Sequence, residues 1–178
     1  GRVTRVDARK RQVETAFGQL HTAAVLNVIP PQKAGLIAER AGVVDASGWV
    51  PVKAESFETR QVAGIYALGD ATLAAPMPKS AFVANTQGRL VAAALVAELT
   101  GTAAPEASFS NTCYSLIGPG YGISVAGVYR AERGQIVEVP GSGGVSPVDA
   151  GAAFRAAEAD YGEGWYGAIC ADIWGKGA

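Results

Sequence analysis

The feature that most limits what this chain can fold into is a short apolar run, Gly64–Leu68, that stops at Gly69 and Asp70. The apolar run predicts a buried strand of an open α/β sheet. Such sheets hold their ligands at the carboxyl ends of the strands, which is where Gly69 and Asp70 lie. The glycine lets a ligand approach the backbone, and the aspartate offers a fixed acceptor. An aspartate in an ordinary turn gives the same pattern, so these residues alone leave both interpretations open.

A long helix is predicted soon after this strand. Ser80 is a suitable N-cap, the helix continues through Leu99, and Gly101 is a suitable stop. Gly88 lowers the helix propensity of the interior but permits close backbone packing. The N-terminus of such a helix presents unpaired amides and a positive dipole end, which favour an anionic ligand group.

The residues before the strand and helix predict smaller elements. Residues 2–7 and 12–17 alternate apolar and polar side chains around a charged turn, which predicts a hairpin. The nearly continuous apolar run 22–29 predicts a second buried parallel strand. A short helix closed by a glycine is expected at 33–41, and short strands and turns are expected within 48–59.

The C-terminal part predicts an antiparallel sheet with one helix. A linker is expected at 101–105, and a final helix is expected over 149–173, with glycines that weaken its second half. Three strand-like runs lie between them, separated by glycine and proline turns: 112–117, 122–129 and 135–139. The expected fold class is therefore α/β plus α+β, with the antiparallel sheet and helix in the second part of the chain.

Composition and charge exclude several classes of function. A formal net charge of −1, with both signs scattered along the chain, gives no field that would collect nucleic acid. No apolar run approaches the roughly 20 residues of a membrane-spanning helix. The two cysteines, Cys113 and Cys170, lack a metal-ligand spacing, so no metal site is expected. A disulfide between them stays open.

Several blocks of sequence resemble one family. Asn111–Ile117 (Asn-Thr-Cys-Tyr-Ser-Leu-Ile) and Gly120–Ala126 are similar to the C-terminal domain of the flavoprotein subunit of flavocytochrome c sulfide dehydrogenase. Gly64–Ala71 resembles the second FAD fingerprint of the pyridine nucleotide-disulfide oxidoreductase superfamily, which includes that subunit. Further similar blocks follow the family order over almost the whole chain: Asn27–Gln32, Met77–Ser80, Gly143–Asp149 and Trp165–Tyr166.

The resemblance implies an FAD site. Residues 1–104 would form the C-terminal part of a Rossmann-like FAD-binding domain, and residues 105–178 would form the interface domain of a sulfide dehydrogenase. The implied cofactor-binding residues are two ribityl contacts and the start of the long helix, which faces the pyrimidine edge of the isoalloxazine: Gly69, Asp70, Pro78, Lys79, Ser80 and Ala81. Lys79 would bring a positive charge to that edge or to an anionic sulfur species; a solvated loop lysine is the alternative.

The resemblance also implies a reaction. Cys113 would be one cysteine of a redox disulfide beside the flavin and, with Lys79, the catalytic part of this chain. Sulfide would attack the disulfide and form a cysteine persulfide, and two electrons would pass to FAD and then singly to a c-type haem subunit. A thiolate beside a flavin suits this chemistry. The family is periplasmic, so the same compartment is expected here.

Departures from the family pattern shape the expected organisation. The Gly-x-Gly-x-x-Gly phosphate-binding fingerprint does not occur in these residues. In the family that fingerprint, the tether to FAD and the partner cysteine all lie upstream of the matched blocks. We therefore expect this chain to work with an N-terminal half of the flavoprotein and with a cytochrome subunit, and not to be a complete enzyme alone.

Two other functions stay open. A sulfide:quinone oxidoreductase or an NADH dehydrogenase-like flavoprotein would need an amphipathic membrane-binding end, and residues 172–178 show little of one. A non-catalytic module that docks a cytochrome through the C-terminal sheet need not retain flavin. Cys170 is expected to be a packed helix residue. Trp165 and Tyr166 would lie near the flavin or the haem subunit, or in the core of the final helix.

Overall fold

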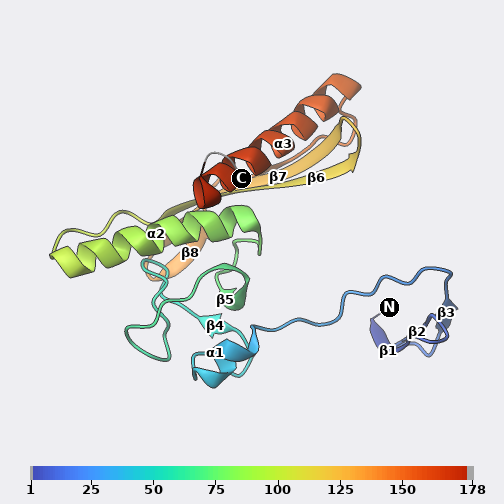
Figure 1. The fold of residues 1–178 in the computed structure, drawn as a ribbon, viewed down its shortest axis with the longest axis horizontal. Coiled ribbons are helices and arrows are strands. Elements are labelled where there is room, and N and C mark those ends of the chain that lie inside the picture. Colours follow the sequence, from blue (N-terminus) through green and yellow to red (C-terminus); the bar gives the residue numbers. More distant parts are fainter. Residues whose placement is uncertain (1, 176–178) are drawn as a thin grey trace. The chain divides into compact units, whose positions relative to one another are not determined.

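The computed structural model describes residues 2–175 and divides the chain into two compact units, Gly1–Gln32 and Lys33–Ala178 (Figure 1). The first unit is a three-stranded antiparallel sheet, in which β2 lies between β1 and β3. Its strands are β1 (Val3–Asp7), β2 (Gln12–Thr15) and β3 (Leu20–Thr22). The predicted hairpin is therefore confirmed. Gly1 and the tail residues 176–178 lie outside the described residues.

Two predicted strands are wrong. Residues 23–32 form no helix or strand, and the side chains of Val25 and Ile29 are 85% and 81% exposed. Residues 64–68 form only one isolated bridge, between Tyr66 and Glu58, and Leu68 is 41% exposed. A buried parallel strand needs paired neighbours on both sides and covered faces. Among residues 2–175, the structure provides no such neighbours for either run.

The segment before the long helix consists of short elements. Helix α1 (Leu36–Arg40) is shorter than the predicted helix and is followed by a glycine in the left-handed region. Strand β4 (Val50–Pro51) pairs in parallel with β5 (Thr72–Leu73). The 3-10 turn η1 (Gly69–Ala71) leads directly into β5. This single parallel pair brings the Gly69 turn next to the segment that contains Trp49.

The predicted long helix is confirmed as α2 (Ala81–Thr100). The hydroxyl oxygen of Ser80 accepts a hydrogen bond from the Val83 N–H at 3.1 Å, so Ser80 is the N-cap. Gly101 ends the helix with φ 69°, a conformation that glycine adopts without steric cost. Both ends of the helix are therefore fixed by residues that the sequence marked.

The C-terminal half is an antiparallel sheet with α3 (Ala152–Trp174) along one face (Figure 1). The sheet contains β6 (Ser108–Gly118), β7 (Tyr121–Glu132), β8 (Gln135–Glu138) and β9 (Gly144–Val145), and β7 pairs with the other three. The mixed architecture with an antiparallel sheet and a C-terminal helix is as predicted. Helix α3 continues through its glycines. At Gly122 its backbone approaches β7 so closely that a Cβ atom would lie 2.5 Å from the Ala159 nitrogen.

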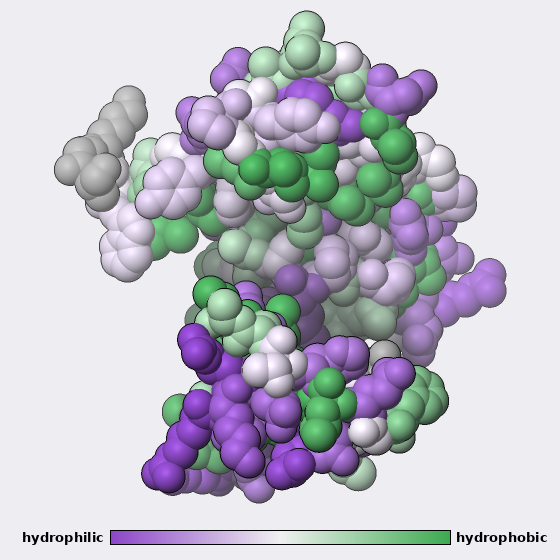
Figure 2. All heavy atoms as spheres, turned by 90° about the vertical axis from the view of Figure 1, so that its right-hand side faces the viewer, coloured by the Kyte–Doolittle hydropathy of each residue, from purple (hydrophilic) through white to green (hydrophobic). Residues whose placement is uncertain are grey.

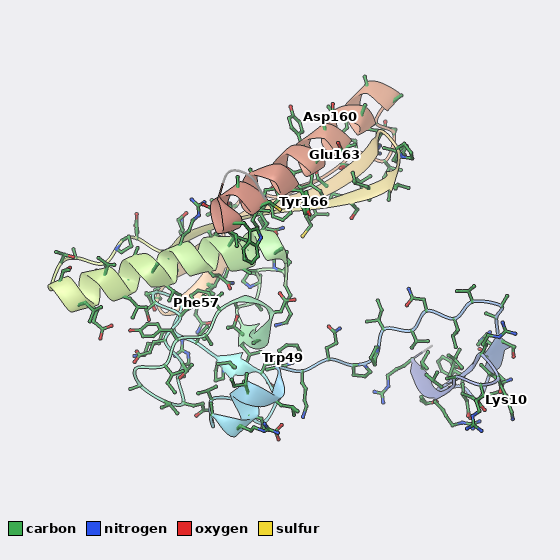
Figure 3. All side chains as sticks on the ribbon, in the orientation of Figure 1. Lys10, Trp49, Phe57, Asp160, Glu163 and Tyr166 are labelled. Carbon is green, nitrogen blue, oxygen red and sulfur yellow. The ribbon has the colours of Figure 1, made fainter. Side chains whose placement is uncertain are left out.

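One hydrophobic core joins residues 33–104 to the sheet. Phe57, whose side chain is fully buried, packs edge-to-face on Phe109 of β6 with ring centroids 5.6 Å apart. Figure 3 shows Phe57 beside α2, and Val83 and Leu90 of that helix belong to the same core. The expected boundary after residue 104 thus crosses a shared core, while the compact units divide after Gln32.

A buried ion pair fastens α3 to the sheet. Glu158 is 7% exposed and accepts hydrogen bonds from the hydroxyls of Ser124 and Ser146, both at 2.6 Å. Arg155, 4% exposed, lies 3.5 Å from the same carboxylate and also donates to the carbonyl of Pro147. The hydroxyl of Ser124, then that of Ser146, holds the pKa of Glu158 below its ordinary value of 4.5.

Replacing Glu158 with glutamine is expected to reduce the loss of stability in acid. A carboxyl group whose folded-state pKa is lowered stabilises the protein above its unfolded pKa, and that contribution is lost as the pH falls through the folded value. Urea midpoints measured from about pH 7 to pH 3 should therefore fall less steeply in Glu158→Gln than in the wild type. Glu163→Gln, on the same helix and exposed, should keep the wild-type slope (Figure 3). Equal slopes for all three proteins would contradict this role for Glu158.

Apolar side chains are exposed around the β6–β7 turn. Leu116, Ile117 and Tyr121 are 55%, 63% and 45% exposed. Figure 2 shows hydrophobic side chains at the surface among polar ones.

Within residues 2–175, no helix is both long and apolar enough to cross a membrane.

Candidate functional site

The N-terminus of α2 opens into a small pocket. Five of the six residues predicted to bind a cofactor line it: Gly69, Asp70, Pro78, Lys79 and Ser80. The sixth, Ala81, is the first residue of the helix. The pocket has a volume of about 110 Å³. Ligand pockets commonly measure about 300–1,000 Å³, so this one suits one edge or chain of a larger ligand.

Gly69 is held in place by a glutamine that sequence reasoning missed. Its N–H donates to the side-chain oxygen of Gln87 at 2.6 Å, and Gln87 is 2% exposed. Gly69 has φ +72°, which a residue with a Cβ rarely adopts. A polar residue among the buried positions of α2 was the available signal for Gln87. This contact fixes the Gly69 turn against the helix.

The carboxylate of Asp70 is free at the pocket. Asp70 is exposed, and within residues 2–175 the structure gives its side chain no hydrogen-bond partner. Only its backbone carbonyl is bonded, and that oxygen accepts from Lys79. An acceptor without a protein partner is able to serve a ligand hydroxyl.

Lys79 binds the protein's own backbone. Its ammonium group donates to the carbonyls of Asp70 at 2.6 Å and Thr72 at 2.8 Å, and lies 3.9 Å from the ring centroid of Trp49. Burial lowers the pKa of Lys79, and the charge of Asp70 opposes this shift. The lysine therefore ties the Gly69 turn to Trp49, which is labelled in Figure 3. Lys79 is part of the pocket lining, and its two hydrogen bonds hold the Gly69 turn against the start of α2.

Cys113 is linked to the start of α2 through Asn111. The hydroxyl of Ser80 donates to Asn111 Oδ1 at 2.6 Å, and Asn111 Nδ2 lies 3.5 Å from the sulfur of Cys113. Asn111 is 2% exposed, whereas Cys113 is partly buried. In the sequence Asn111 is part of the cysteine block but carries no signal that marks a role of its own. The structure thus brings together the cysteine and the helix start, which were predicted separately.

The remaining predicted residues lie apart from this link. Cys170 and Cys113 are both free thiols, so the disulfide that the sequence left open is not formed. Trp165 stacks on Phe82, in the first turn of α2, with centroids 5.6 Å apart and an interplanar angle of 17°. Tyr166 is 67% exposed. Trp165 therefore packs α3 against the start of α2, which it supports from the side.

These residues fit one part of a flavin site. The first N–H groups of a helix have no intrahelical acceptor, and Ser80 occupies only that of Val83, so those of Ala81 and Phe82 remain for a ligand. An N-terminal dipole and free amides suit the anionic edge of a reduced flavin. Asp70 offers an acceptor that could serve a ribityl hydroxyl, and the free thiol of Cys113 is linked to the same helix start. Metal ligation has no comparable set, because residues 2–175 hold no cluster of three potential ligands.

The comparison with known families finds a match in the C-terminal part of the chain. Residues 105–174 match the family model described as flavocytochrome c sulphide dehydrogenase, flavin-binding. This segment contains β6 to α3, and over these residues the resemblance found in the sequence is confirmed.

Replacing Asp70 with alanine in the flavin-containing protein is expected to weaken FAD binding by about tenfold or more without lowering the melting temperature. The carboxylate bonds to no described protein group, so we expect its loss to affect a bound ligand and not the fold. Flavin fluorescence titration and thermal unfolding measure the two effects. An unchanged FAD affinity with a large fall in melting temperature would assign Asp70 to the turn itself.

Proposed function

We propose that this chain is part of an FAD-dependent sulfide dehydrogenase that passes electrons to a c-type cytochrome. The observation that carries the proposal is the hydrogen-bonded link from Cys113 through Asn111 to Ser80. It places a cysteine of the family-matched segment next to the helix start whose free amides suit a flavin edge.

Each residue of the site has a part in this proposal. Gly69 and Asp70 bind the ribityl chain, and the turn from Pro78 to Ala81 faces the flavin edge. Lys79 holds that turn through the carbonyls of Asp70 and Thr72. FAD, when bound, supplies a two-electron acceptor.

Cys113 provides the sulfur chemistry. In the oxidised protein its sulfur is joined to a second cysteine from outside this chain. A hydrosulfide ion attacks one sulfur of that disulfide, a new sulfur–sulfur bond forms, and the departing thiolate takes the electron pair of the broken bond. Asn111 Nδ2 lies within reach of a thiolate formed at Cys113. A second hydrosulfide ion would remove the outer sulfur of the persulfide as hydrodisulfide and release the second thiolate, and the two thiolates would re-form the disulfide as a bound FAD accepts their two electrons.

The proposal requires partners. A further segment of the flavoprotein supplies the phosphate-binding loop and the second cysteine, and a c-type cytochrome receives the electrons. The periplasm is the compartment we propose, because the resemblance implies it.

The test uses the flavoprotein that contains both this chain and the rest of the FAD domain. Under anaerobic conditions, sulfide should bleach the flavin absorbance, and added cytochrome c should then be reduced. Reduction of a quinone instead of cytochrome c would favour a sulfide:quinone oxidoreductase. A protein that binds cytochrome but retains no flavin would be a docking module, and the proposal would fail.

This chain on its own is expected to lose FAD during dialysis. Its pocket of about 110 Å³ encloses only part of such a ligand, and losing a few kcal/mol of contacts weakens binding by orders of magnitude. Flavin absorbance after exhaustive dialysis of the purified chain measures this directly. Stoichiometric retention would show that this chain alone holds the whole cofactor.

A further inference from the structure

We infer that Asn111 is a positioning residue that presents a hydrogen-bond donor to the thiolate of Cys113. The inference rests on the proposed function, in which Cys113 reacts as a thiolate. Asn111 and Cys113 lie two residues apart on β6, so their side chains share one face of the sheet. The amide of Asn111 is 2% exposed and is fully enclosed between this face and the start of α2.

Two partners fix the orientation of the amide. Ser80 already accepts from the Val83 N–H, so its own hydroxyl proton donates to Asn111 Oδ1 at 2.6 Å. On the other side, Nδ2 donates to the carbonyl of Val125 at 3.3 Å. Rotating the amide by 180° would place Oδ1 against the Val125 carbonyl and leave the Ser80 proton without an acceptor. Only one orientation therefore satisfies both partners.

In this orientation one Nδ2 hydrogen remains for the sulfur. Nδ2 lies 3.5 Å from Cys113 Sγ, and Oδ1 lies at the same distance. A neutral thiol would donate to Oδ1, which would then accept from both Ser80 and Cys113. A thiolate accepts from Nδ2, and a hydrogen bond to a charged acceptor is stronger than one between neutral groups. The fixed amide therefore keeps a donor within reach of the sulfur when Cys113 reacts as a thiolate.

The test measures the thiol and does not depend on flavin. In a Cys170→Ser background Cys113 is the only thiol of the chain. Asn111→Asp keeps the side-chain shape but replaces the donor with a carboxylate, which should slow alkylation by iodoacetamide at neutral pH by about tenfold or more. The ultraviolet absorbance of the thiolate should fall in parallel. Ser110→Ala, on the opposite face of the same strand, is the matched control and should keep the wild-type rate.

A second pair of variants covers the case in which Asn111→Asp does not fold by circular dichroism. Ser80→Ala releases Oδ1 and should slow alkylation by about threefold, whereas Ser80→Thr restores the hydroxyl and the rate. The inference is overturned if Asn111→Asp reacts at the wild-type rate, or if its rate falls with unchanged thiolate absorbance. Equal rates for Ser80→Ala and Ser80→Thr would also overturn it. If thiolate support is found but sulfide does not reduce the flavin, the proposed function fails and Asn111 keeps its role.

Discussion

Replacing Cys113 with serine is expected to slow sulfide-dependent flavin reduction by about 10³-fold or more while FAD stays bound. A serine hydroxyl keeps the size of the side chain and a hydrogen bond to Asn111, but it cannot form a sulfur–sulfur bond. The flavin contacts proposed at Asp70 and Ser80 are unaffected. Anaerobic stopped-flow measurement of flavin bleaching in the complete flavoprotein provides the rate, and the absorbance before mixing gives the flavin content.

The matched control for Cys113→Ser is Cys170→Ser. Cys170 is also a free, partly buried thiol, but it lies on α3 outside the link to Ser80. Its substitution should leave the rate of bleaching within about twofold of the wild-type rate, which is a free-energy change below about 0.5 kcal/mol. Equal losses in both variants would mean that the two cysteines act as a pair, and a full rate in Cys113→Ser would remove Cys113 from the reaction.

Replacing Gly122 with alanine is expected to destabilise the fold by about 3 kcal/mol. The new Cβ atom would lie 2.5 Å from the Ala159 nitrogen and 2.7 Å from the Glu158 carbonyl carbon. Both are backbone atoms of α3, so no side-chain rotation relieves the clash and the helix must move away from β7. Urea unfolding, followed by the circular dichroism of the helices, measures the loss.

Gly164→Ala separates the close contact from the general effect of adding a methyl group. Gly164 lies on α3, and apart from its chain neighbours and the backbone of its own helix no atom lies within 4 Å of its Cβ position. Alanine there should stabilise the helix by about 0.5–1 kcal/mol, because it restricts the unfolded chain. A fall in stability of equal size in both variants would argue against the packing contact at Gly122.

Elements whose ends carry local signals were predictable from the sequence. Helix α2 begins after Ser80 and ends before Gly101 because the cap hydrogen bond and the left-handed turn are both local. The antiparallel strands β6 to β8 are neighbours in sequence, so their pairing needs only short turns. Local chemistry therefore predicted most of the C-terminal architecture.

The two predicted parallel strands failed for a non-local reason. Runs 22–29 and 64–68 have the composition of buried strands, but composition cannot supply their neighbours. A parallel strand takes its hydrogen bonds from segments far away in the sequence. Without such segments among residues 2–175, apolar side chains such as Val25 are left exposed. The apolar pattern indicates a tendency to form a strand, but a strand forms only where another segment pairs with it.

The candidate site was predictable in its parts but not in its connections. Gly69, Asp70 and Ser80 were each marked by a turn or a cap. The buried amides that join them, Gln87 and Asn111, come from α2 and β6, and their partners are fixed only when these elements pack. Side-chain bonds between distant elements leave no periodic signal in the sequence.

The packing of Phe57 on Phe109 sets a limit on how this domain can be exchanged between proteins. The family match begins at residue 105, but the first matched strand buries Phe109 against an aromatic ring from residues 33–104. In a chimera joined at residue 105, Phe57 and Phe109 would come from different parent proteins, and their contact would be lost or changed. Recombination after Gln32, where the compact units divide, keeps both rings in the same parent. The part of the chain that packs around this core is therefore larger than the segment that the family model matches.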